Sequence, residues 1–284
     1  MSRLTEVAAR REAMTTIVGL TSVFEGLASM RIAQTKNQVQ QSQAFFSELW
    51  QMYSQLRVDS LFRFGRSQEE KPINKQLYIV ITSEGGFSGD IDQKLINWLL
   101  QNYDPAKQDI IVIGHHGAVL LIQADVTFKK YFTLPARDRN INVEPLVREI
   151  RRYRDTTVYY QTYVSLMVQD VKRIALNTAV AEQGRKAGKG EEVISEANYI
   201  FEPSALDVAA HLERSMTQIA LSQVILDSKL AQYASRFRAM SMANDKAGEW
   251  LDDLNMLYNR TKRRGQDERL KEIINGLRKA RGNA

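Results

Sequence analysis

Residues 204–281 read SALDVAAHLERSMTQIALSQVILDSKLAQYASRFRAMSMANDKAGEWLDDLNMLYNRTKRRGQDERLKEIINGLRKAR, and this stretch decides the fold. It contains no proline, and its first glycine is Gly248. A single helix over this stretch would be roughly 110 Å long at ~1.5 Å per residue. Helices of globular cores rarely run much past ~25 residues without a cap, so this length is typical of a coiled coil.

Two series of seven-residue steps run along this stretch and are apolar at most positions. The first series comprises Ala209, Met216, Gln223, Leu230, Phe237, Asn244, Leu251 and Tyr258, and the second comprises Leu212, Ile219, Leu226, Tyr233, Met240, Ala247, Leu254 and Thr261. Only Gln223, Asn244 and Thr261 interrupt the apolar seam. This heptad pattern predicts a coiled-coil helix over residues 204–284. Ser204, with Asp207 three residues later, is a suitable N-cap.

A second long helix is expected over residues 1–58, which contain no proline. Its apolar stripe comprises Leu4, Val7, Met14, Val18, Ala28, Ile32, Val39, Phe46, Leu49, Tyr53 and Leu56, interrupted by Arg11, Thr21, Glu25, Thr35 and Ser42. Gly19 and Gly26 lie seven residues apart, hence on one face, where we expect another backbone to approach closely. Two long helices at the two ends of one chain most simply pair with each other, antiparallel. A self-dimer through the C-terminal helix is the competing interpretation.

Between the two helices, apolar segments alternate with helical ones. Residues 77–82 and 109–113 are nearly all apolar, as in strands that are buried on both faces. Further strands are expected near 127–134, 158–167, 171–179 and 193–201, and helices over 90–102, shortly after 113, and over 144–153. This alternation predicts an α/β fold with a largely parallel sheet. The chain is therefore divided into an N-terminal helix (1–58), a Rossmann-like α/β domain (59–203) and a C-terminal helix (204–284).

Composition excludes several classes of protein. The chain has 284 residues and no cysteine, so disulfides and thiolate metal sites are excluded. The start, MSRLTE, does not resemble a signal peptide, and no apolar run approaches the length of a membrane span. We therefore expect a soluble or peripheral protein.

The net charge of +6 is concentrated at one end of the chain. Residues 260–284 hold nine Lys or Arg and three Asp or Glu, which gives +6, and the rest of the chain is balanced. A basic tip suits nucleic acid, an anionic membrane surface or an acidic protein socket.

Two short motifs invite a chemical interpretation. The turn 83–89 (SEGGFSG) follows a strand and precedes a helix, as phosphate loops do, but its spacing matches neither standard nucleotide-binding pattern. We expect a structural turn there, with no cofactor. His115 and His116 are adjacent, so their side chains diverge, and the remaining histidine, His211, lies on the long helix. No metal site and no catalytic residues are expected.

Four stretches together resemble the gamma subunit of F-type ATP synthases, the central rotor stalk. They are 77–89 (LYIVITSEGGFSG), 199–204 (YIFEPS), 234–240 (ASRFRAM, followed by Ala243 and Asp245) and 254–260 (LNMLYNR). The resemblance spans nearly the whole chain and is most specific in its C-terminal third. There are also departures. The turn has Glu84-Gly85-Gly86 where the family has Asp-Arg-Gly, the N-terminal helix lacks a Lys-Ile-Thr-x-Ala-Met run, and a family Gln-x-x-x-Thr pair aligns with Arg263 and Asp267, so a specialised paralogue is an open alternative.

The resemblance implies a non-enzymatic rotor subunit. Its partners would be the alpha and beta subunits of a catalytic ring, the epsilon subunit and the membrane rotor c-ring, on the cytoplasmic face of a membrane. It implies that Arg236 faces the catalytic ring, and we expect the same of the basic-tip residues Arg260, Arg263 and Arg264. No nucleic-acid partner is expected. Two alternatives stay open: a nucleotide-using enzyme built on the glycine-rich turn, and a coiled-coil scaffold or nucleic-acid-binding protein that uses the basic tip.

Overall fold

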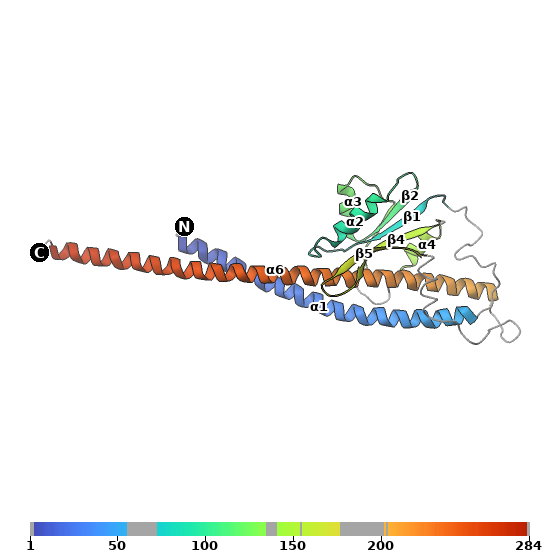
Figure 1. The fold of residues 1–284 in the computed structure, drawn as a ribbon, viewed down its shortest axis with the longest axis horizontal. Helices are drawn as coiled ribbons and strands as arrows, with labels where there is room; N and C mark the ends of the chain where they lie inside the picture. The colour runs from blue at the N-terminus through green and yellow to red at the C-terminus, as the bar shows by residue number, and fades with distance from the viewer. Residues whose placement is uncertain are drawn as a thin grey trace. The chain divides into compact units, whose positions relative to one another are not determined.

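A computed structural model describes residues 3–55, 73–134, 141–153, 155–176, 202 and 204–282. The chain forms two compact units, Met1–Leu27 with Arg238–Ala284 and Ala28–Phe237. The helices α1 (Arg3–Gln55) and α6 (Ala205–Gly282) contribute to both units (Figure 1). The expected domain boundaries lie at or beside residues outside the described ranges and stay a prediction, and the strand expected at 193–201 lies wholly outside them.

The long C-terminal helix begins where the sequence predicted. The Ser204 hydroxyl oxygen accepts a hydrogen bond from the Asp207 amide (3.1 Å), and the same hydroxyl lies 2.7 Å from the Asp207 carboxylate. This cap satisfies one of the amides that the first turn of a helix leaves unpaired. From there α6 runs for 78 residues without a break.

In the first unit, the terminal parts of α1 and α6 form an antiparallel coiled coil. The Thr21 hydroxyl lies 3.0 Å from Asn244 Oδ1, and the Arg11 guanidinium lies 4.5 Å from the centre of the Tyr258 ring. Arg11 precedes Thr21 on α1, whereas its partner Tyr258 follows Asn244 on α6. The two helices therefore run antiparallel. Both Thr21 and Asn244 are polar members of the seams, so their contact fixes the register, as polar core pairs do in coiled coils. The fold class predicted from the sequence is confirmed.

The two stripes expected from the sequence are the buried ones. On α1, the least exposed positions of this unit include Val7 and Thr21, and on α6 they include Met240 and Ala247. Beyond Thr261, every side chain of α6 that the structure describes is exposed.

The expected close approach at Gly19 and Gly26 is wrong. Both glycines are exposed, and a Cβ atom at either position would meet no heavy atom within 4 Å. Their seven-residue spacing does place them on one face, but that face is rotated away from the stripe that contains Thr21. Two small residues spaced seven apart lie on the same face of a helix, but this spacing does not indicate whether another helix packs against that face.

A disulfide can test this pairing because the chain has no native cysteine. We expect Thr21→Cys with Asn244→Cys to cross-link within monomers under mild oxidation, since these side chains are in contact. Thr15→Cys with Asn244→Cys is the control, because Thr15 is exposed on α1. Non-reducing gel electrophoresis separates the products, and efficient dimer formation by Asn244→Cys alone would instead support a self-dimer.

The second unit contains a five-stranded sheet of order β3-β2-β1-β4-β5. Its strands are β1 (Gln76–Ile81), β2 (Gln108–Ile113), β3 (Lys130–Phe132), β4 (Thr156–Tyr163) and β5 (Gln169–Ala175). The pairs β1–β2, β1–β4 and β2–β3 are parallel and β4–β5 is antiparallel, so the sheet is largely parallel as predicted. The helices between the strands are α2 (Ile91–Gln101), α3 (His115–Gln123) and α4 (Glu144–Ile150).

The strands β1, β2 and β4 are buried on both faces of the sheet, and α6 covers one of these faces. Tyr78 and Val80 of β1 pack with α2 and α3, whereas Leu77, Ile79 and Ile81 point to the opposite face. The core on that opposite face is completed by α4 and by Leu221, Val224 and Ile225 of α6. Figure 1 shows α2 and α3 on one side of the sheet and α6 on the other. The first part of α6 is therefore a core helix of the α/β unit, and Phe46 of α1 packs on its outer side against Met216 and Ala220.

One helix meets the length and composition of a membrane span, contrary to the sequence expectation. An 18-residue window of α1 has a mean hydropathy of 1.3, and only 6% of that window is buried within the chain. The exposed apolar side chains of this helix are Ile17, Leu20, Val23, Phe24, Leu27, Met30, Phe45 and Met52. None of them belongs to the apolar stripe expected from the sequence, so α1 has apolar residues on more than one face.

Candidate functional site

The turn after β1 is held by a side chain of α6. Arg236 donates from Nε to the Gly86 carbonyl (3.3 Å) and from Nη2 to the Gly85 carbonyl (3.4 Å) and the Ser88 hydroxyl (3.2 Å). The turn thus presents carbonyl oxygens to a cation, whereas a phosphate loop presents amide hydrogens to an anion. Burial lowers the pKa of Arg236 from its ordinary value, but arginine remains charged at neutral pH.

Ser235, the residue before Arg236 on α6, also bonds to this turn. The Ser235 hydroxyl, which is buried, donates to the Ser88 carbonyl at 2.6 Å. Gly89 has φ +65° and Phe87 has φ +66°, a conformation that is uncommon for a residue with a side chain. Such strain persists only where the surroundings over-determine the backbone, and the two contacts from α6 do this here.

A buried carboxylate lies behind the turn. Asp92, in the first turn of α2, is 1% exposed. Its Oδ2 atom accepts a hydrogen bond from the Ser83 hydroxyl and lies 2.8 Å from Nδ1 of His116. The remaining oxygen, Oδ1, accepts from Nε2 of Gln161 at 2.5 Å. A buried carboxylate is stable only when it is hydrogen-bonded in this way.

Gln161 carries this network to the long helix. Its Oε1 atom accepts hydrogen bonds from the Ser228 hydroxyl and from Nε2 of Gln232 (3.3 Å), and Gln232 also donates to Ser228 (3.0 Å). Gln161 and Ser228 are 0% exposed, and Gln232 is 4% exposed. Every polar atom of the Gln161 side chain therefore has a role in joining α2, β4 and α6.

The network occupies the place where α/β folds usually bind ligands. In such sheets, ligands bind at the carboxyl ends of the strands where the strand order reverses, which here lies between β1 and β4. Gln161 follows Tyr159, the last described partner of β1 on β4. Side chains of α6 fill this position, so the architecture uses it to hold a helix.

The carboxylate of Glu84 holds the turn to two neighbouring segments. It accepts hydrogen bonds from the amides of His115 (3.2 Å) and Leu134 and from the Tyr131 hydroxyl (3.3 Å). His115 is the first residue of α3, so this carboxylate lies at a helix N-terminus, where negative charge is stabilised. Glu84 thus ties the turn to α3 and to the segment after β3.

The His116–Asp92 pair makes stability depend on pH. The hydrogen bond to Asp92 raises the pKa of His116 above 6.5, burial opposes the rise, and the Asp92 charge adds to it. A raised pKa means that the pair contributes stability fully below about pH 6.5 and loses it as pH rises through the folded-state pKa. We expect His116→Gln to reduce the loss of unfolding free energy between pH 6 and 8 in urea titrations.

The matched control is His211→Gln on α6, where the histidine is exposed. This variant removes a histidine that does not contact Asp92, so a change of slope found only in His116→Gln is assigned to the His116–Asp92 pair. An unchanged slope in His116→Gln would contradict the assignment to the His116–Asp92 pair.

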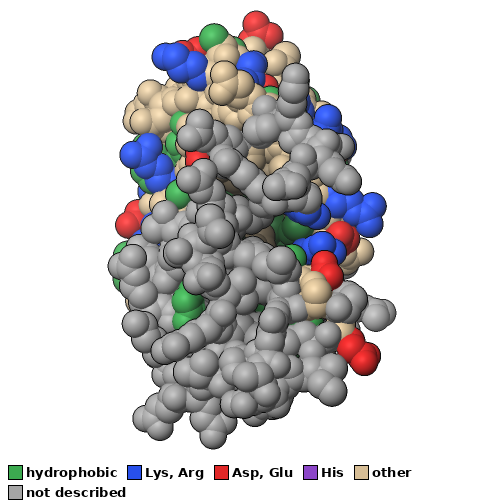
Figure 2. Space-filling view, turned by 90° about the vertical axis from the view of Figure 1, so that its right-hand side faces the viewer, with side chains coloured by type: hydrophobic (Ala, Val, Ile, Leu, Met, Phe, Trp, Pro, Cys, Tyr) green, Lys and Arg blue, Asp and Glu red, His purple; other side chains and the backbone are tan. Residues whose placement is uncertain are grey.

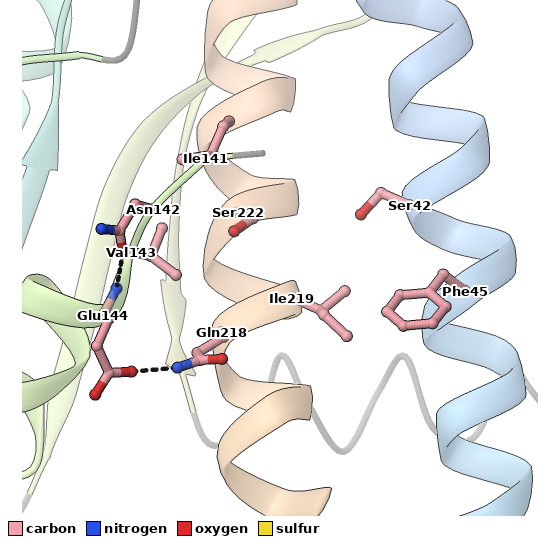
Figure 3. A pocket seen from close by; sticks show the side chains of 9 residues that line it. All are labelled: Ser42, Phe45, Ile141, Asn142, Val143, Glu144, Gln218, Ile219 and Ser222. Atoms are coloured by element: carbon pink, nitrogen blue, oxygen red, sulfur yellow. Dashed lines mark hydrogen bonds between the residues drawn. The ribbon is translucent and has the colours of Figure 1, made fainter. Parts of the chain in front are cut away.

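A shallow cavity of about 250 Å³ lies between α1, α6 and the start of α4 (Figure 3). Its lining residues are Ser42, Phe45, Ile141, Asn142, Val143, Glu144, Gln218, Ile219 and Ser222. The Glu144 carboxylate accepts a hydrogen bond from Gln218, and the Glu144 amide donates to Asn142 Oδ1 (3.1 Å). None of the nine lining residues is cationic, so the cavity is unsuited to phosphate.

The structure separates the expected site residues into two groups. Arg236, a residue of α6, is bound to the turn after β1 in the second unit, whereas Arg260, Arg263 and Arg264 are exposed on the last part of α6 in the first unit. Among the described residues, no three His, Asp or Glu side chains gather as metal ligands would. Among the described side chains visible in Figure 2, basic and acidic residues are interspersed.

Sequence reasoning missed the Asp92–Gln161 network. Ser83, Asp92, Gln161 and Ser228 are ordinary residues in their local patterns, and only their burial together gives them a role. Ser228 and Gln232 lie outside the two heptad series, and the nearest polar interruption of those series is Gln223, so the heptad pattern did not mark them.

Comparison with known proteins identifies the family. A family model described as ATP synthase matches residues 3–278. The ATP synthase gamma chain of Macrococcus caseolyticus is 28% identical over 237 residues, covering 73% of this chain and 75% of that protein. The gamma chain of Clostridium novyi is 22% identical over 267 residues, covering 90% and 91%.

Solved structures share the fold. The rotor of the Euglena gracilis mitochondrial ATP synthase has a TM-score of 0.62 at 13% identity and covers 92% of this chain and 98% of its own. The central stalk and c-ring structure from Tetrahymena thermophila contains a chain with a TM-score of 0.55 at 14% identity, covering 79% and 99%.

Proposed function

The chain belongs to the ATP synthase family, among its gamma subunits, and from this premise we propose that it is the central-stalk rotor of an F-type ATP synthase. The carrying observation is the antiparallel coiled coil formed by the two ends of one chain, with the α/β unit built around the same long helix. Its partners are the alpha and beta subunits, the epsilon subunit and the c-ring of a membrane-associated complex. The cytoplasmic face of that membrane is the proposed location.

The mechanism needs no bond chemistry from this chain. Ion flow through the membrane sector turns the rotor, and rotation of an asymmetric shaft presents different contacts to each beta subunit in turn. A contact can shift a conformational equilibrium only if it differs in strength between the two states, so the catalytic sites change as the contacts change. We propose that the chain transmits torque and is itself no enzyme.

Exposed apolar residues on both helices support enclosure by partners. In the first unit, α6 leaves Trp250, Met256 and Leu257 exposed, and α1 leaves Ile17, Leu20 and Phe24 exposed. Near its end, α6 also exposes Leu270, Ile273, Ile274 and Leu277. By their spacing, Ile17, Leu20 and Phe24 share one helix face, as do Leu270, Ile273, Ile274 and Leu277, and exposed apolar faces of this kind mark protein interfaces. A surrounding ring of subunits would cover them.

The proposed ring contacts differ in kind. Arg260, Arg263 and Arg264 are exposed and would meet the ring directly. Arg236 is bound to the turn and would act by holding the shape of the surface beside it.

Co-purification tests this function. A tagged chain expressed in its native host is expected to recover alpha and beta subunits in stoichiometric amounts. Recovery of the chain without them, together with DNA affinity that falls by several powers of the salt concentration, would support the nucleic-acid alternative instead.

A further inference from the structure

We propose that the hydrogen-bonded network through Gln161 sets the register of α6 on the α/β unit and is the joint through which torque passes between them. This inference rests on the proposed rotor function. It names Gln161, Ser228 and Gln232 as positioning residues.

Two kinds of contact hold α6 to the sheet, and only one kind specifies its position. Leu221, Val224 and Ile225 pack on the core of the sheet, and apolar contacts of this kind are non-directional. Because they have no preferred direction, a small slide or rotation of the helix weakens them gradually. They therefore stabilise the packing but specify the register of the helix less sharply than hydrogen bonds do.

The polar contacts are directional and buried. Gln161 donates to Asp92 on one side and accepts from Ser228 and Gln232 on the other, so a shift of α6 breaks these bonds where water cannot replace them. An unsatisfied buried polar group costs far more than the bond contributes when it is made. Buried networks of this kind favour one arrangement over its near neighbours.

The two ends of the joint are themselves anchored. Asp92 is held by Ser83 and His116, so Gln161 is bonded to a fixed carboxylate. One helical turn beyond Gln232, Ser235 and Arg236 bond to the turn after β1. The side chains at 228, 232, 235 and 236 follow the helical period, so they form one continuous polar stripe along α6.

Making the joint apolar tests the inference. The triple variant Gln161→Leu, Ser228→Ala, Gln232→Leu removes both sides of the network, which leaves few orphaned partners and keeps a similar volume. Asp92 retains Ser83 and His116 in this variant. Spin labels on Gln101→Cys in α2 and Arg214→Cys in α6, both exposed, report the helix position by electron–electron distance measurements on the full chain.

The parent chain is expected to show one narrow distance distribution, and the triple variant a distribution at least about twice as broad. Gln93→Leu is the matched control, because this exposed amide of α2 bonds only to Asn97 among the contacts described for it. If the triple variant does not fold, Ser228→Ala with Gln232→Leu decides the question. A distribution as narrow as that of the parent overturns the inference.

The proposed role of the joint in transmitting torque is tested in the membrane-bound complex. We expect the triple variant to keep hydrolysing ATP, while the number of ions transported per ATP hydrolysed falls several-fold. A general loss of folding would instead lower both activities together. A broad distance distribution with unchanged coupling overturns the role in torque. A failure of the proposed rotor function is distinguishable from a failure of this inference, because the parent chain would then not co-purify with alpha and beta subunits.

Discussion

Gly114→Ala is expected to lower the free energy of unfolding by more than about 3 kcal/mol, which is a large effect for a single methyl group. Gly114 joins β2 to α3 with φ +102°, a region that residues with side chains rarely adopt. A Cβ there would lie 2.1 Å from the Thr82 carbonyl oxygen and 2.7 Å from its carbon.

The neighbouring backbone cannot move aside at Gly114. The Thr82 amide donates to the Ile113 carbonyl (2.8 Å), and the Gly114 amide donates to the Phe132 carbonyl (2.9 Å). These bonds tie the ends of β1, β2 and β3 together, so a shift of Thr82 would disturb the carboxyl edge of the sheet and the Ser83–Asp92 contact next to it.

Urea denaturation followed by circular dichroism measures this effect. Gly86→Ala is the control, because a Cβ there meets no heavy atom within 4 Å, and it is expected to change stability by less than about 1 kcal/mol. A Gly114→Ala protein as stable as the Gly86→Ala control would show that the close approach at Thr82 is relieved in solution.

The second large effect is expected at the basic tip. Each Arg→Glu substitution changes the net charge by −2, so replacing both Arg263 and Arg264 lowers it from +6 to +2. Both side chains are exposed, so the free chain should be as stable as the parent. In the assembled complex we expect the ATPase rate at low salt to change by about tenfold, the result of a differential interaction of ~1.4 kcal/mol.

The physical reason is screening. Exposed charges are screened beyond ~8 Å at physiological ionic strength, whereas charges enclosed by a subunit ring are screened much less. The same two charges can then distinguish one ring state from another, and the difference should shrink as salt is raised.

ATPase assays of the complex across a salt series provide the measurement. Arg151→Glu with Arg152→Glu is the matched control, because it reverses an adjacent, exposed Arg pair beside α4 in the α/β unit and changes the net charge equally. An ATPase rate equal to that of the parent at every salt concentration would remove Arg263 and Arg264 from the proposed ring contacts.

Local patterns were sufficient to predict the elements of this fold. The heptads of 204–281 identify α6, and the seam positions Asn244, Ala247 and Leu251 are indeed less exposed than their neighbours Asp245 and Lys246. The nearly unbroken apolar run 77–81 identifies a strand buried on both faces, which is β1. These predictions succeed because the period of side-chain burial is a property of the helix or strand itself.

The sequence by itself therefore determined the elements, their order and the family resemblance, whereas the tertiary structure decided which faces meet. Gly19 and Gly26 share a face that no part of the chain described by the structure covers, and the polar residues Ser228 and Gln232 are buried because β4 brings Gln161 to them. Arg236 is bound to a turn that lies about 150 residues earlier in the chain. The periodicity of a sequence defines the faces of each helix or strand. Whether a face is buried depends on which element, distant in sequence, packs against it, and no local pattern contains that information.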